Sequence, residues 1–133
     1  MRIFIDTNVL ISAMLNPAGT PFMAYQKAVN MPNHAIISKQ NIDELKRIFI
    51  KKFPHRMSSL DRFLSVALLS IETVQIPTDI NSSESLVRDV ADRPILRAAI
   101  SAKADILLTG DKDFLESKIT KPRIMTPSEF INL

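Results

Sequence analysis

The sequence predicts an α/β fold in which a short, parallel central sheet lies between two layers of helices. Two observations predict this three-layer α/β/α sandwich. Short apolar segments alternate along the chain with segments whose apolar residues repeat at helical spacing. The 133 residues are 46% hydrophobic and include no cysteine, which suits a single domain over residues 1–133 with one core and no disulfides. In such sheets, ligands bind beyond the carboxyl ends of the strands.

The first residues carry strand and then helix signals. Arg2–Ile5 predicts a buried strand that ends at Asp6. Thr7 and Asn8 are residue types that cap helices, so we expect a helix to follow them. Residues 16–19 include a proline and a glycine and predict the end of that helix.

A second helix and a second strand follow. Thr20 before Pro21 predicts a helix start, with threonine as the N-cap and proline at the first helical position. Residues 35–37 are apolar and predict a short strand. Ser38 is expected to cap the next helix, because apolar residues recur at helical spacing after it, at positions 42, 45, 48 and 49.

The middle of the chain predicts a helix, a strand and a loop. The helix is expected to begin at Ser58 or Ser59 and to carry apolar residues as far as Ile71. Residues 73–76 predict a strand that a proline ends, and the polar residues 78–88 predict a loop.

The last third predicts two strands and two helices. Asp92 precedes a segment with helical spacing, and residues 105–109 predict a strand. Residues 123–125 predict a last short strand. Residues 126–129 read Thr-Pro-Ser-Glu, which is the capping box of a helix start.

Charge is distributed unevenly, although the net charge is only +3. Residues 39–56 carry a net charge of +4, and residues 72–92 carry a net charge of −4. A basic segment beside an acidic one suits a protein that holds a polyanion near a metal ion. Two solvated faces would explain the same distribution.

Four acidic residues lie where the predicted fold would bring them together. Asp6 and Asp111 each follow the carboxyl end of a predicted strand, so they should share one rim of the sheet. Asp92 lies at the start of the helix that leads to the later of these strands, and Glu44 lies in the first turns after the second strand. Clustered carboxylates repel, and some stay protonated unless a cation joins them. Oxygen ligands favour Mg²⁺ or Mn²⁺.

Each acid also has an ordinary structural explanation. Asp6 and Asp92 are suited to cap helices. Glu44 in a first turn would favour the helix dipole. Asp111 and Asp113 follow a glycine, which is common turn composition. The prediction of a metal site therefore depends on the combination of acids and on no single one.

Composition argues against several other chemistries. The two histidines, His34 and His55, follow proline-containing turns and do not suggest a two-histidine ribonuclease. Two glycines are too few for a phosphate-binding loop or a dinucleotide fingerprint. Aromatic residues make up 6%, which disfavours a base-stacking sheet. The N-terminus runs directly into a strand pattern without a secretory signal, so we expect a cytoplasmic protein.

Four segments of the chain resemble one known family. These segments are IFIDTNVLISAML at 3–15, Ser38 with Glu44-Leu45, RDVAD at 88–92 with the following helix, and ADILLTGDKDF at 104–114. Together they resemble the PIN-domain nucleases almost from end to end. The order of the first and last motifs is specific to that family, whereas either alone would be only suggestive.

The resemblance implies a divalent-metal-dependent endoribonuclease that hydrolyses RNA to 5′-phosphate and 3′-hydroxyl products. The implied catalytic and metal-binding residues are Asp6, Glu44, Asp92 and Asp111, with Asp113 as an extra or substitute ligand. Asp89 competes with Asp92 for the third place. Supporting polar residues would be Asn8, Ser38 and Thr109. The basic residues expected to bind RNA are Lys46, Arg47, Lys51, Lys52, Arg56, Arg93, Arg97 and Lys112.

Within the family, the sequence looks most like VapC-like toxins of bacterial toxin–antitoxin pairs. That likeness implies a protein antitoxin as partner and a homodimer. The sequence leaves two alternatives open: a PIN-domain nuclease of RNA processing without a toxin role, and a non-catalytic or receiver-like metal-binding signalling module. A receiver domain would need paired acids after the first strand, and this chain has one acid there.

Overall fold

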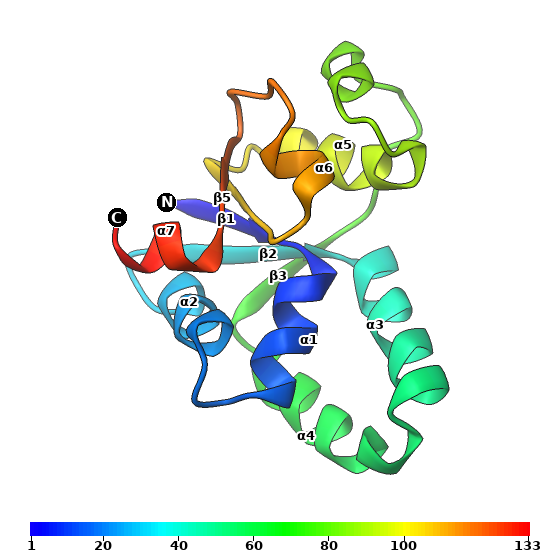
Figure 1. Ribbon diagram of the computed structural model, residues 1–133, viewed down its shortest axis with the longest axis vertical. Helices are drawn as coiled ribbons and strands as arrows, with labels where there is room; N and C mark the ends of the chain where they lie inside the picture. Colours follow the sequence, from blue (N-terminus) through cyan, green and yellow to red (C-terminus); the bar gives the residue numbers. More distant parts are fainter.

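A computed structural model describes all residues, 1–133, and contains one five-stranded sheet. The strands are β1 (Arg2–Ile5), β2 (His34–Ser38), β3 (Ile71–Val74), β4 (Ile106–Leu108) and β5 (Arg123–Met125). Their order across the sheet is β3-β2-β1-β4-β5, and every neighbouring pair is parallel (Figure 1). The predicted parallel α/β fold is therefore confirmed.

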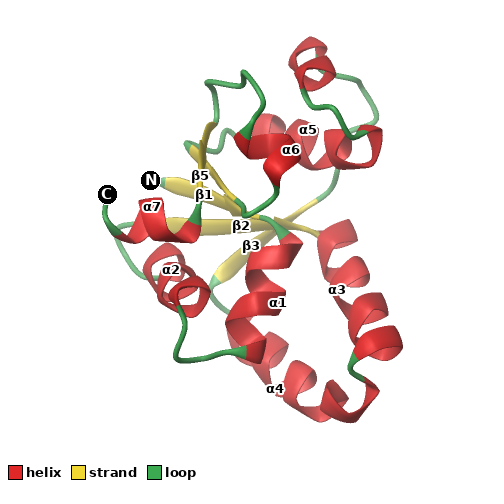
Figure 2. Cartoon of the chain, in the orientation of Figure 1, coloured by secondary structure: helices red, strands yellow, loops and turns green.

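Helices connect the strands and cover both faces of the sheet (Figure 2). The α-helices are α1 (Thr7–Leu15), α2 (Thr20–Val29), α3 (Lys39–Lys52), α4 (Met57–Ala67), α5 (Arg93–Ser101), α6 (Lys112–Leu115) and α7 (Pro127–Ile131). The chain also forms three short 3₁₀ helices, which are η1 (Pro54–Arg56), η2 (Ser82–Leu86) and η3 (Val90–Asp92). None of the helices combines the length and hydrophobicity that crossing a membrane requires.

The alternation of side chains along the central strand divides the core into two layers. In β1, Ile3 and Ile5 pack in a cluster with residues of α1, α2 and α7, whereas Phe4 packs on the other face with residues of α5 and α6. All three side chains are fully buried. A parallel sheet that is covered on both faces needs apolar residues at every position of its central strands, as here.

The α3–α4 hairpin extends away from the sheet (Figure 1). It has its own apolar cluster. Leu45 and Phe49 of α3 pack there against Leu60 and Leu64 of α4, with side chains of α1 beside them. This packing fixes the direction of α3, whose first turns carry Glu44.

The predicted boundaries were wrong in the middle of the chain. Strand β3 begins at Ile71 and ends at Val74, two residues earlier than predicted, and helix α4 ends at Ala67. Ile71 pairs with Ala35 of β2 and is 7% exposed. It continues the helical spacing of α4 by coincidence, which explains the error. The predicted loop at 78–88 contains the 3₁₀ turn η2.

Two predicted helix caps were also wrong. Asp6 is the N-cap residue of α1, and Thr7 and Asn8 lie inside the first turn. Gly19 holds the N-cap position of α2, so Thr20 is its first helical residue. Ser38 does cap α3, because its side chain accepts a hydrogen bond from the Asn41 backbone N–H.

Candidate metal centre

The acidic rim lies where the strand order reverses. The chain proceeds from β1 outward to β2 and β3, and then returns to place β4 on the other side of β1. The crevice outside the carboxyl ends of β1 and β4 is therefore a topological switch point, where α/β sheets bind ligands. Asp6 directly follows β1, and Thr109 and Asp111 follow β4.

Asp6 is buried at this crevice and is 5% exposed. Its Oδ2 accepts a hydrogen bond of 2.7 Å from the Thr109 hydroxyl. Burial raises the pKa of Asp6 to about 6, the Thr109 hydrogen bond opposes this rise, and the negative charges of Asp111 and Glu44 add to it. A carboxylate held in such surroundings needs a positive partner at neutral pH.

Asp92 shares the crevice. Burial raises the pKa of Asp92 to about 7. The Asp111 carboxylate adds to this rise through its charge and through a side-chain hydrogen bond, and the charges of Asp89 and Asp6 add less. Asp92 occupies the N-cap position of α5, but its side chain makes no capping hydrogen bond. Its Oδ2 is buried without any hydrogen-bond partner. The capping explanation for Asp92 therefore fails, and its oxygen is left for a ligand.

Asp111 and Asp89 do act as caps. Asp111 Oδ1 accepts a hydrogen bond of 2.9 Å from the Asp113 backbone N–H at the start of α6. Asp89 Oδ1 accepts one of 3.0 Å from the Ala91 backbone N–H at η3. One cap bond uses a single lone pair, so each carboxylate keeps further acceptor capacity.

A second group of carboxylates lies beside the group formed by Asp6, Asp92 and Asp111. One oxygen from each of Asp89, Asp92 and Asp113 lies within 4.8 Å of the others. Asp92 belongs to both groups, since the charges of Asp6 and Asp111 also act on it. The two alternatives for the third acid, Asp89 and Asp92, thus lie together at one rim.

Glu44 reaches the rim through a polar network that sequence reasoning missed. The Thr7 hydroxyl lies 3.5 Å from Glu44 Oε2 and accepts a hydrogen bond of 2.6 Å from Asn41 Nδ2. Asn41 in turn contacts the Ser38 hydroxyl. Thr7, Ser38 and Asn41 are all buried. Ser38 therefore supports Glu44 indirectly, as the N-cap of α3.

Asn8 lies at a hollow that borders the rim. A cavity of about 330 Å³ is lined by Asn8, Gly110 and Pro127, among others. The Oδ1 atom of Asn8 is buried and has no hydrogen-bond partner. An unpaired buried polar atom beside an open hollow is suited to contact a bound molecule.

The basic residues that the sequence singled out divide into three groups. Exposed side chains on α3, on η1 and at the start of α6 are free of ion pairs; these are Lys46, Arg47, Lys51, Lys52, Arg56 and Lys112. Arg93 is half-buried, and its Nε donates a hydrogen bond of 2.9 Å to the Val87 carbonyl oxygen. Arg97 was wrongly included: its side chain is 16% exposed and pairs with the buried Glu84 at 2.8 Å.

Three hydrogen bonds in all, including this 2.8 Å contact, hold the Arg97 side chain in the fold. Two join it to the carboxylate of Glu84, and one joins it to the Pro77 carbonyl oxygen at 3.0 Å. These contacts hold the segment before η3 against α5. The two partners lie 13 and 20 residues before Arg97 in the chain, so sequence spacing gave no sign of them.

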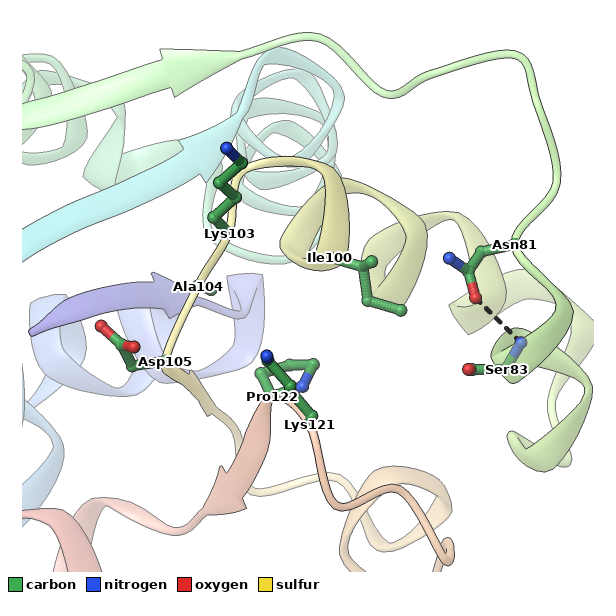
Figure 3. Close-up of a pocket in the computed structure, with 8 residues that line it drawn as sticks. All are labelled: Asn81, Ser83, Ile100, Lys103, Ala104, Asp105, Lys121 and Pro122. Carbon is green, nitrogen blue, oxygen red and sulfur yellow. Dashed lines mark hydrogen bonds between the residues drawn. The ribbon is translucent and has the colours of Figure 1, made fainter.

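A cavity of about 590 Å³ lies at the opposite rim, near the amino ends of β4 and β5 (Figure 3). Lys103, Asp105 and Lys121 line it together with apolar and small polar residues. Asp105 accepts a hydrogen bond of 2.7 Å from the Arg2 backbone N–H, so it has a structural role there. None of the acids of the switch-point crevice lines this cavity.

Comparison with known proteins agrees with this arrangement. A family model described as PIN domain matches residues 2–113, which include every acid of the rim. The chain belongs to the PIN domain family. PIN domains are in general nucleases. The uncharacterized protein MJ1680 of Methanocaldococcus jannaschii is 30% identical over 145 residues, which cover 98% of this chain and 90% of that protein.

The PIN fold is also found among solved structures. One chain in the crystal structure of VapBC2 from Rickettsia felis, bound to a DNA fragment from its promoter, superimposes with a TM-score of 0.70. The match covers 95% of this PIN domain chain and 98% of that chain, at 21% sequence identity. The receiver-like alternative is excluded, because receiver domains have the strand order 2-1-3-4-5 and this sheet does not.

Proposed function

We propose that this PIN domain is a divalent-metal-dependent endoribonuclease. The observation that supports this most strongly is the convergence of acids from four distant segments, Asp6, Glu44, Asp92 and Asp111, on one crevice. Burial and mutual repulsion raise the pKa values of two of them, Asp6 and Asp92, to about 6 and about 7. Groups with such shifted pKa values cluster at functional sites.

The residues of the rim fit Mg²⁺ or Mn²⁺. Every candidate ligand is an oxygen atom, which is the donor that these cations prefer. Asp92 Oδ2 is buried and unpaired, and a cation would satisfy it. We assign metal binding to Asp6, Asp92 and Asp111, with Glu44 on one side and Asp113 on the other.

The reaction that fits these residues is hydrolysis of an RNA phosphodiester bond. A bound divalent cation would lower the pKa of the attacking water and stabilise the leaving oxygen. Thr109 keeps the Asp6 carboxylate in one orientation through the 2.7 Å hydrogen bond. From the neighbouring hollow, the unpaired Oδ1 of Asn8 would accept a hydrogen bond from the RNA, for example from a ribose hydroxyl. Attack by water breaks the bond to the 3′ oxygen and leaves a 5′-phosphate and a 3′-hydroxyl.

Binding of the RNA chain is assigned to the exposed basic residues. Lys112 lies beside Asp111, and Lys46 and Arg47 follow Glu44 on α3. Lys51 lies about 10 Å from Glu44 along the helix axis, because each residue adds about 1.5 Å. Phosphates of neighbouring nucleotides could reach these side chains while one phosphate lies at the acids.

The biological role that we propose is that of a toxin held inactive by a protein antitoxin. The likeness in fold to a chain of the VapBC2 assembly supports this role. An antitoxin that covered the acidic crevice would exclude metal and RNA together. We further propose a homodimer in the cytoplasm.

The nuclease activity is tested with purified protein and mixed RNA. Cleavage is expected with Mg²⁺ or Mn²⁺ and is expected to stop in EDTA. Asp6→Asn and Asp92→Asn should each abolish cleavage while the protein stays folded, because each removes a charge from the site. Asp61→Asn on the exposed face of α4 removes the same charge elsewhere and should cleave like the wild type. Near wild-type cleavage by either rim variant would disprove the proposed site.

The toxin role is tested by controlled expression in a bacterial host. Wild-type protein should arrest growth, and Asp6→Asn should not. Co-expression of a small protein encoded next to the toxin should restore growth. Harmless high-level expression of a protein that cleaves RNA in vitro would refute the toxin role and leave the nuclease proposal intact.

A further inference from the structure

Arg88 forms an exposed ion-pair network at the edge of the acidic rim. Its Nη2 lies 2.9 Å from Asp113 Oδ1 and 2.8 Å from Glu116 Oε2. Its Nε donates a further hydrogen bond of 3.1 Å to the same Asp113 oxygen. The guanidinium therefore joins the residue before Asp89 to α6 and to the residue that follows this helix.

The same Asp113 takes part in the group of carboxylates around Asp92. One oxygen from each of Asp89, Asp92 and Asp113 lies within 4.8 Å of the others. Asp113 Oδ1 already accepts a hydrogen bond from Arg88 Nε and lies 2.9 Å from Arg88 Nη2. A cation that drew Asp113 into its ligand set would either displace Arg88 or share the carboxylate with it, and sharing would bring two positive charges close together.

Arg88 is much more exposed than Arg97, another arginine held in an ion pair. The side chain of Arg88 is 68% exposed, whereas that of Arg97 is 16% exposed. Exposed ion pairs contribute little to stability, so they exchange partners at low cost. Glu116, which is 58% exposed, would retain the guanidinium near the rim after Asp113 had released it.

We infer that Arg88 is a built-in counter-cation that competes with the divalent metal ion for Asp113 and so weakens metal binding. The inference rests on the proposed metal site. Arg88 is a positioning residue in this role: it acts through Asp113 and sets the metal concentration at which the rim fills. Glu116 is its second partner and keeps it close.

The first test is a calorimetric titration of the full chain with Mn²⁺. Arg88→Gln should bind Mn²⁺ about two- to fivefold more tightly than the wild type, the range expected when one exposed ion pair is removed. Arg62→Gln on α4 loses the same charge without an ion pair and should match the wild type. Arg88→Lys keeps the charge but not the forked geometry, and should fall between Arg88→Gln and the wild type.

The second test follows the guanidinium itself by NMR. The Arg88 Nε–Hε signal, identified by its loss in Arg88→Gln, should shift when Mg²⁺ is added to the wild type. Equal Mn²⁺ affinity in Arg88→Gln and Arg62→Gln, or a signal that does not move on saturation with Mg²⁺, would overturn the role of Arg88 alone. If neither the wild type nor Arg88→Gln bound Mn²⁺, the proposed metal site itself would fail and the inference with it.

Discussion

The Thr109 hydroxyl donates a 2.7 Å hydrogen bond to Asp6 Oδ2 and so ties together two strand ends that lie 103 residues apart in the chain. The same hydroxyl oxygen accepts a hydrogen bond of 3.0 Å from the Asp111 backbone N–H. The buried Thr109 side chain thus orients the Asp6 carboxylate and fixes the backbone of Asp111.

Replacement of Thr109 by valine should destabilise the protein and impair the site. Valine keeps the shape of threonine but removes both hydrogen bonds, so Asp6 Oδ2 and the Asp111 N–H lose their partners. Each unsatisfied buried group costs about 1–3 kcal/mol. We expect the free energy of unfolding in urea to fall by about 2 kcal/mol or more. Thr109→Ser keeps the hydroxyl and serves as the control; equal stability of the two variants would contradict the assigned role.

Much of the site could be predicted because it depends on strand ends. Parallel strands bring their carboxyl ends to one rim, so the positions of Asp6 and Asp111 followed from two apolar segments and a topology rule. The position of Asp92 followed from the predicted helix that precedes β4. These relations depend on the order of elements, which hydrophobic spacing reveals.

Contacts between side chains from different helices could not be predicted in this way. The hydrogen bond from Asn41 to Thr7 exists because α1 packs against α3, and spacing alone does not define that packing. The buried pair of Glu84 and Arg97 looked like two separate surface charges. The sequence pattern places residues on elements, but it does not show which polar groups meet once those elements have packed.

The metal-free protein should become less stable as the pH rises from about 4 to about 8. The pKa values of Asp6 and Asp92 are raised to about 6 and about 7, so the folded state binds protons more tightly than the unfolded chain does. Stability falls with pH wherever the folded state holds more protons. The contribution of protonated Asp6 is lost as the pH passes about 6, and that of Asp92 as it passes about 7.

This dependence is measured by thermal unfolding in EDTA across that pH range. Asp92→Asn stays neutral at every pH, so its melting temperature should exceed that of the wild type at pH 8 and should vary less with pH. Asp61→Asn again provides the charge-matched control. A wild-type melting temperature that rises steadily between pH 5 and pH 8 in EDTA would count against strong repulsion at the rim.

Millimolar Mg²⁺ or Mn²⁺ should raise the melting temperature at pH 8. A ligand that binds only the folded state stabilises it by mass action, by about 2.7 kcal/mol at a hundred times its dissociation constant. Asp111→Asn can still accept the α6 cap bond through its amide oxygen, but it removes one charge from the rim. We expect this variant to melt higher than the wild type in EDTA and to gain less from metal. An identical gain in both proteins would remove Asp111 from the ligand set.

The basic segment at the end of α3 should contribute to RNA affinity and to its dependence on salt. A triple replacement of Lys51, Lys52 and Arg56 by alanine removes three exposed cations. For single-stranded RNA, each lost phosphate contact should lower the log–log salt slope by about 0.7. Binding is best measured by fluorescence anisotropy with Asp6→Asn as the background, because RNA then stays intact.

A matched triple variant distinguishes local contacts from the effect of net charge. Lys103, Lys121 and Arg123 are also exposed but lie at the opposite rim, near the amino ends of β4 and β5. Figure 3 shows the first two of them. Their replacement by alanine changes the net charge by the same amount. If RNA binds along the acidic rim and α3, only the α3 variant should show a smaller salt slope and a weaker affinity for RNA. Equal losses in both variants would mean that RNA responds to overall charge and that α3 is not a specific binding surface.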